Sequence, residues 1–114
     1  MFENKFENVT QDDKSIAMLV HFSGVISILG PLVIWLLKKD QSEYVNVNGK
    51  IALNFQIPLF LIGLVIGAIV HLIDFGGFIL TLLGLVNIVL CLLNGYKAYN
   101  GDLPKYPISI EILK

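Results

Sequence analysis

Three uncharged blocks dominate the sequence, at residues 16–37, 51–73 and 75–96, with lengths of 22, 23 and 22 residues. All eight lysines and all nine acidic residues lie between or outside these blocks. An α-helix rises 1.5 Å per residue, so roughly 20 apolar residues cross the ~30 Å hydrocarbon core of a bilayer. Each block is therefore long enough to span a membrane.

The pattern predicts an all-α integral membrane protein with three transmembrane helices and no separate soluble domain. The composition agrees, because 55% of the residues are hydrophobic and 15% are charged, against about 45–50% and 25% in soluble domains. The net charge of −1 lacks the basic bias of nucleic-acid binders. The expected single domain has an N-terminal tail at 1–14, transmembrane helices at 15–37, 51–73 and 75–97, and a C-terminal tail at 98–114.

The distribution of lysines predicts an orientation. With three spans, the N-terminal tail and the turn at Asp74 share one side, which carries two lysines; the other side carries six. Positively charged loops stay in the cytoplasm. We therefore expect a multi-pass protein of the plasma (inner) membrane, with its N-terminus outside and its C-terminus in the cytoplasm.

Short patterns at the two ends predict local structure. Thr10 and Asp13 have the spacing of a capping box, which favours a helix that begins directly after Thr10. The repeat of Phe2 and Phe6 fits either a helix lying at the membrane surface or a polar tail. Residues 106–112 alternate apolar and polar side chains, which predicts a short extended segment. This segment would pack on the cytoplasmic helix ends or add to the sheet of a partner.

Small and weakly polar residues recur along one face of each block. In lipid such faces mark helix–helix contacts, so we expect a helix-packing or partner-binding seam. Two prolines interrupt the blocks: Pro31 removes a donor from the carbonyl of Ser27, and Pro58 from that of Asn54. The seam residues are Gly24, Ser27, Pro31, Gln56, Gly63, Gly67, Gly84, Asn87, Cys91 and Asn94.

A second candidate site is a polar pocket inside the membrane, formed by Asn54, Gln56, His21 and His71. Intramembrane ionisable residues are functional candidates, but the histidines and Asp74 lack the spacing of a zinc site. The lone cysteine forms no internal disulfide. Neither a nucleophile elbow nor a phosphate-binding loop is present. We therefore expect no cofactor, no metal and no catalytic residue, so the protein is predicted not to be an enzyme.

Segments 30–40 (GPLVIWLLKKD), 51–57 (IALNFQI) and 105–108 (KYPI) together carry a family resemblance. They resemble an uncharacterised family of small bacterial membrane proteins related to the Tic-type channel component of the chloroplast inner-envelope protein-import machinery. The resemblance covers roughly residues 15–114. It implies a helical membrane protein that works alongside protein transport, and it supplies no catalytic residue.

The leading functional hypothesis is a non-enzymatic accessory subunit of a larger membrane complex, linked to protein translocation or insertion. Its partners would be the lipid bilayer and other integral membrane proteins, including a protein-translocation complex, and not nucleic acid. One alternative is a self-associating transporter or channel that uses the polar pocket. Another is an immunity or envelope-stress membrane protein.

Overall fold

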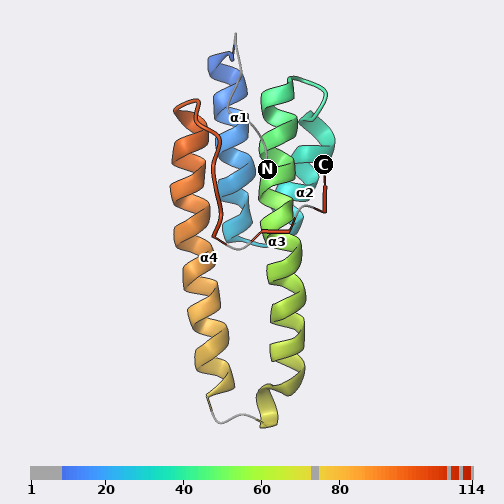
Figure 1. The fold of residues 1–114 in the computed structure, drawn as a ribbon, viewed down its shortest axis with the longest axis vertical. Coiled ribbons are helices and arrows are strands. Elements are labelled where there is room, and N and C mark those ends of the chain that lie inside the picture. Colours follow the sequence, from blue (N-terminus) through green and yellow to red (C-terminus); the bar gives the residue numbers. More distant parts are fainter. Residues whose placement is uncertain (1–8, 73–74, 108, 111, 114) are drawn as a thin grey trace.

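A computed structural model describes residues 9–72, 75–107, 109–110 and 112–113, without the side chain of His71. These residues are helical, with turns and extended segments but no strand, so the predicted all-α class is confirmed (Figure 1). The predicted surface helix around Phe2 and Phe6 lies outside the described residues. In chain order the elements are α1 (Gln11–Phe22), the 3-10 turn η1 (Ser23–Val25), α2 (Leu29–Lys38), α3 (Glu43–Ile69), the 3-10 turn η2 (Val70–Leu72) and α4 (Gly76–Tyr99).

Two helices form the long axis of the molecule. Helix α3 has 27 residues and α4 has 24, and both are long and apolar enough to cross a membrane. They run antiparallel, with η2 and the start of α4 at one tip of the molecule (Figure 1). We call this tip the turn end, and we call the opposite end, where α3 begins and α4 stops, the head end.

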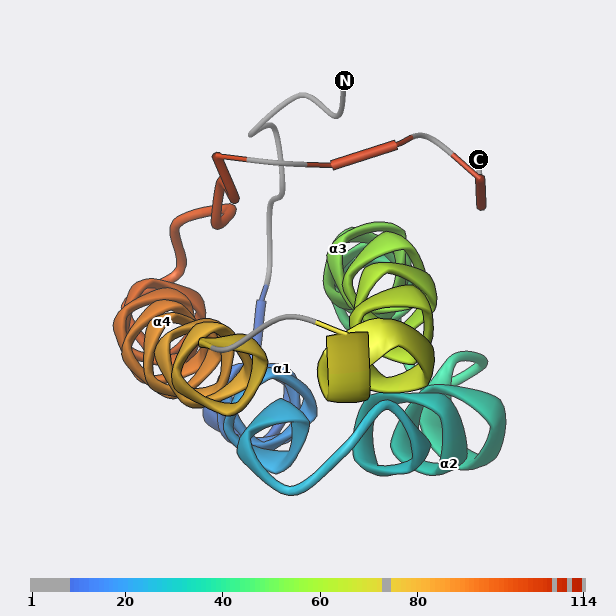
Figure 2. The same ribbon diagram turned by 90° about the horizontal axis from the view of Figure 1, so that it is seen from below.

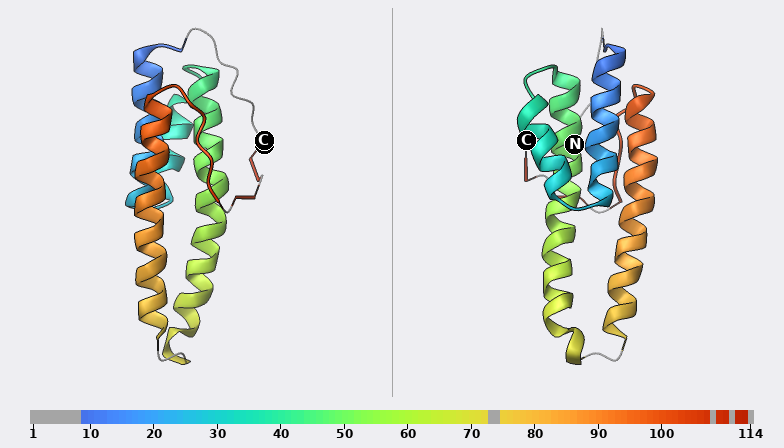
Figure 3. Two further views of the ribbon diagram at one scale, coloured as in Figure 1. Left: turned by 60° about the vertical axis from the view of Figure 1, so that its left-hand side comes forward. Right: turned by 180° about the vertical axis from the view of Figure 1, so that it is seen from behind.

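The first apolar block does not form a spanning helix, so the prediction of three transmembrane helices is not confirmed. The block divides into α1, of 12 residues, and α2, of 10, which at 1.5 Å per residue are about 18 and 15 Å long. Helix α2 turns back toward the head end, and the resulting α1–α2 hairpin covers only the head half of α3 and α4 (Figures 1 and 3).

Local chemistry explains why the chain turns here. Pro31 lies in the first turn of α2, where a helix needs no amide donor from it. The carbonyl of Ser27 instead accepts the amide of Gly30 at 3.2 Å. A Cβ atom on Gly30 would lie 2.5 Å from the carbonyl oxygen of Ser23, so this close approach of the two arms requires glycine.

The folded-back hairpin changes the predicted orientation. The start of α1, the α2–α3 loop and the end of α4 all lie at the head end (Figure 1), whereas the prediction placed the N-terminal and C-terminal tails on opposite sides. The lysines of the described helices lie toward the head end: Lys14, Lys38 and Lys97 are in end turns of α1, α2 and α4, and Lys50 is the eighth residue of α3.

The core fills only the head half of the molecule. Helix α1 lies in the groove between α3 and α4 on one side, and the C-terminal tail crosses the opposite side (Figure 2). One cluster of buried residues joins Ala17, Tyr44 and Ala98, and another joins Val47, Ile51, Phe55 and Tyr106. In the turn half, large apolar side chains of α3 and α4 point outward, as Phe60, Val65, Phe78 and Leu85 do, which suits contact with lipid tails.

Two predictions of local structure concern the start of α1 and the C-terminal tail. Thr10 caps α1, and both hydrogen bonds of the capping box with Asp13 are present, so this prediction is confirmed. Among its described residues the C-terminal tail has no strand, and it packs along the head half of α3.

We predict that Gln11 and Lys97 face the same side of the membrane and that Phe75 faces the other. In a Cys91→Ala background, the exposed positions Gln11→Cys, Lys97→Cys and Phe75→Cys are labelled in intact cells with a membrane-impermeant maleimide. Q11C and K97C should react alike, and F75C should show the opposite accessibility. Reaction of Q11C together with F75C, and not with K97C, would support three spans instead.

Candidate functional site

His21 is the centre of a buried polar cluster in the head half. It lies in the last turn of α1 and is completely buried. Its Nε2 lies 3.0 Å from Oδ1 of Asn48, and its Nδ1 lies 2.7 Å from the hydroxyl oxygen of Tyr106. The side-chain nitrogen of Asn48 donates to the carbonyl of Tyr44, so its oxygen is the acceptor for His21. This assigns the neutral tautomer with the proton on Nε2, and Tyr106 then donates to Nδ1.

Burial also sets the charge of His21, which lies outside the two spanning helices. Complete burial lowers the pKa of His21 to about 4, although the hydrogen bond to Asn48 works in the opposite direction. Burial raises the pKa of Tyr106 well above its ordinary value. Both groups are therefore uncharged at neutral pH, which suits an apolar interior.

The C-terminal tail completes this cluster from outside the helices. The ring of Tyr106 stacks on Phe55 with centroids 4.2 Å apart. Beyond it, the amide of Ile110 donates to the carbonyl of Asn54 at 3.1 Å. This is the carbonyl that Pro58 leaves without a helical donor, so the tail replaces the missing hydrogen bond.

The side chain of Asn54 holds the end of the tail. Its Oδ1 accepts from the amides of Ile112 and Leu113 at 3.1 and 2.7 Å, and its Nδ2 donates to the carbonyl of Leu113 at 3.0 Å. A single buried amide thus makes several contacts with the tail. Asn54 therefore binds the C-terminal tail, whereas the sequence predicted that it lines a polar pocket.

A second polar cluster joins α3 and α4 to η1. Nε2 of Gln56 donates to Oδ1 of Asn87 at 2.8 Å and to Sγ of Cys91 at 3.2 Å. The amide of Asn87 donates to the carbonyl of Gly24 at 2.9 Å. One turn further toward the head end, Asn94 accepts the amide of Lys105. Gln56, Asn87 and Cys91 of the predicted seam thus meet in a hydrogen-bonded contact between helices, whereas Asn94 contacts the C-terminal tail.

The other predicted seam residues are not brought into this contact. A Cβ atom on Gly63, Gly67 or Gly84 would meet nothing within 4 Å, because the α1–α2 hairpin stops short of the turn half. Pro31 is buried, and Ser27 accepts the amide of Leu29. The predicted pocket is also divided, since His21 and Gln56 belong to different clusters and the side chain of His71 lies outside the described residues.

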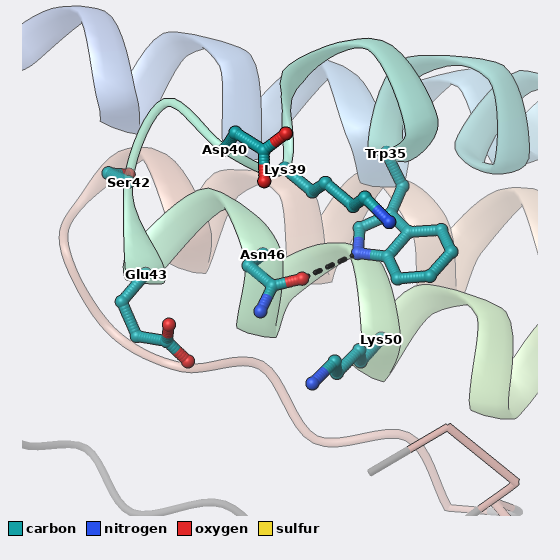
Figure 4. A pocket seen from close by; sticks show the side chains of 7 residues that line it. All are labelled: Trp35, Lys39, Asp40, Ser42, Glu43, Asn46 and Lys50. Carbon is teal, nitrogen blue, oxygen red and sulfur yellow. Dashed lines mark hydrogen bonds between the residues drawn. The ribbon is translucent and has the colours of Figure 1, made fainter.

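An open pocket at the head end was not predicted from the sequence. It has a volume of about 430 Å³ and lies between the end of α2 and the start of α3 (Figure 4). Nε1 of Trp35 donates to Oδ1 of Asn46 at 2.9 Å, and the ammonium of Lys39 lies 4.8 Å from the centre of the Trp35 ring. The seven residues that line it are Trp35, Lys39, Asp40, Ser42, Glu43, Asn46 and Lys50.

A tryptophan near two lysines is the single sequence feature that could have pointed to this pocket. Its residues come from α2, from the α2–α3 loop and from the start of α3. Among the described residues, no group of three or more histidine, cysteine, aspartate or glutamate side chains could hold a metal ion. The buried clusters are suited to holding segments together, and the open pocket is suited to binding a polar group.

Comparison with known proteins gives one match. The sequence model of the magnetosome magnetite crystal formation protein family matches residues 12–113, from the first turn of α1 into the C-terminal tail. Neither the curated proteins nor the solved structures give a significant match. The family match overturns the resemblance to the Tic-type channel component. It also overturns the role in protein translocation, together with the two alternatives considered beside it.

We predict that alanine has opposite consequences at two glycines of the seam. A Cβ atom on Gly24 would lie 2.7 Å from Nε2 of Gln56 and 2.8 Å from Sγ of Cys91, so Gly24→Ala should lower the free energy of unfolding by about 1–3 kcal/mol. Gly63→Ala meets open space and should change it by less than about 1 kcal/mol. Thermal unfolding in detergent measures both, and equal effects would contradict the assigned packing.

Acidification should destabilise the protein through His21. Its pKa is lowered in the folded state, so the unfolded chain binds more protons below pH 6.5, and stability falls as the pH drops toward 4. The expected loss between pH 7.5 and pH 5 is about 2 kcal/mol from this residue. The control is His21→Gln, whose lower starting stability should show a smaller decrease with acidification. An equal decrease in both proteins would exclude His21 as the source.

Proposed function

Because the chain belongs to the magnetosome magnetite crystal formation protein family, we propose that it is a small membrane protein that takes part in forming magnetite crystals. The observation that carries this proposal is the extent of the family match, which runs from residue 12 to residue 113. It therefore includes the α1–α2 hairpin, both long helices and the tail that closes the polar cluster.

The proposed place of action is the magnetosome membrane. The turn halves of α3 and α4 expose large apolar side chains, and the lipid bilayer is their natural partner. The described lysines gather at the head end, so the positive-inside rule favours a cytoplasmic head end and a turn end on the opposite side. Other integral membrane proteins remain proposed partners.

The proposed role is not enzymatic. The polar side chains buried in the head half bind one another and the tail, as His21, Asn54 and Gln56 do. A protein of this kind influences crystal formation by its presence in the membrane and by the groups that it displays at either face. Its removal should therefore alter the size or number of crystals and leave the chemistry of iron uptake unchanged.

The test is complementation in a magnetite-forming bacterium whose own family member has been deleted. We expect expression of this chain to shift the mean crystal length toward that of the undeleted strain, as measured by electron microscopy. Gly24→Ala, which loosens the packing, should complement less well than Gly63→Ala at equal membrane abundance. Membrane-located protein that leaves crystal size and number unchanged would contradict the proposal.

A further inference from the structure

The head-end pocket lies where a lipid head group would lie. Trp35 and Lys39 are at the end of α2, whose side chains Val33, Leu36 and Leu37 are 50, 53 and 74% exposed. Tryptophan and lysine next to an exposed apolar surface are typical of the membrane–water boundary. The acyl chains of a lipid can therefore follow α2 while its head group reaches the pocket.

Charges of opposite sign are separated along the pocket. The ammonium of Lys39 extends over Trp35, and Lys50 lies on the same side, whereas Asp40 and Glu43 lie toward the loop (Figure 4). Lys50 and Glu43 are on one helix, seven residues and about 10 Å apart along its axis. Glu43 begins the helix, so the carboxylates are nearer the head end and the ammonium groups are nearer the membrane.

This order of charges matches one class of ligand. In a zwitterionic phospholipid the phosphate is attached close to the glycerol, and the amine lies beyond it, nearer water. We propose that the pocket binds the head group of a phospholipid that carries a primary amine, of the phosphoethanolamine type. Lys39 and Lys50 bind the phosphate, and Asp40 and Glu43 accept hydrogen bonds from the ammonium group.

The pocket is built before a ligand arrives. Nε1 of Trp35 donates to Oδ1 of Asn46, so the amide nitrogen of Asn46 is the group left to donate to a phosphate oxygen. Gly49 packs directly against the indole, and a Cβ atom there would clash with it. A volume of about 430 Å³ also lies in the range of about 300–1,000 Å³ typical of small-ligand sites. The side chains of Trp35 and Asn46 are therefore already held in place before a ligand binds, which lowers the entropy cost of binding.

The inference does not depend on the proposed role in crystal formation, because its test measures lipid binding alone. Full-length protein in mixed micelles is titrated with dioleoyl phosphatidylethanolamine, phosphatidylglycerol or phosphatidylcholine, and bound lipid is counted by native mass spectrometry. We expect phosphatidylethanolamine to bind about tenfold more tightly than the other two, since only it offers an ammonium with hydrogen-bond donors. Equal affinity for all three lipids would overturn the proposal.

Two pairs of variants locate the site. Glu43→Gln should abolish the preference for phosphatidylethanolamine over phosphatidylglycerol, and Lys39→Gln should weaken binding of both lipids. Asp102→Asn and Lys97→Gln remove equivalent charges at exposed head-end positions outside the pocket, and should leave binding unchanged. Unfolding temperatures in lipid-free detergent show whether each variant is folded. Equal losses in folded pocket and control variants would overturn the assignment.

Soluble phosphoethanolamine separates a lipid from a free phosphate compound as the ligand. It has the same charged groups and no acyl chains, so it should displace the bound lipid only at much higher concentration. Displacement at a concentration equal to that of the lipid would mean that the apolar face of α2 contributes nothing, and it would overturn the assignment to a lipid.

Discussion

The hydrogen bonds of His21 join three segments that are distant in the sequence. Asn48 lies on α3, Tyr106 lies on the tail, and both bind the ring of His21 on α1. In an apolar environment an unpaired polar group costs several kcal/mol, so none of these segments is stable alone in this position. Among the described residues every buried side-chain nitrogen and oxygen has a partner. The need to pair these groups therefore explains why α1 and the tail both enter the groove of the long helices.

The same requirement divides the molecule into two halves. In the head half the polar side chains of α3 and α4 are covered by α1 and by the tail. In the turn half the two helices carry many apolar and small residues, and a Cβ atom on Gly63, Gly67 or Gly84 would meet no neighbour within 4 Å. Helix α1 and the C-terminal tail, whose polar groups need hydrogen-bond partners, thus lie in the head half. The turn halves of α3 and α4 remain exposed and suit contact with lipid. The pocket beside Trp35 lies at the head end of the packed half, where α2 ends and α3 begins.

Several features could be predicted from the residues because each depends on local chemistry. Thr10 and Asp13 form the expected capping box, and two uncharged blocks form long apolar helices. The unpaired carbonyl of Asn54 follows from Pro58 alone. The donor to that carbonyl, Ile110, could not be predicted, because it lies 56 positions after Asn54 and only tertiary packing brings the two groups together. The pocket was missed although its residues are close in the sequence, because it depends on how α2 and α3 pack around the loop between them.

The sequence by itself predicted a helical chain whose uncharged blocks are long enough to cross a membrane, and two of these blocks do form such helices. It also determined which carbonyls lose their helical donors. Only the tertiary structure decided which blocks form a single long helix and which block folds back on itself. A spanning helix and a folded-back hairpin can have the same composition. The hairpin is favoured by the close approach of Gly30 to Ser23 and by the hydrogen bonds of His21 with Tyr106 and Asn48. Those contacts join distant parts of the chain, so their free energy is not contained in any local pattern.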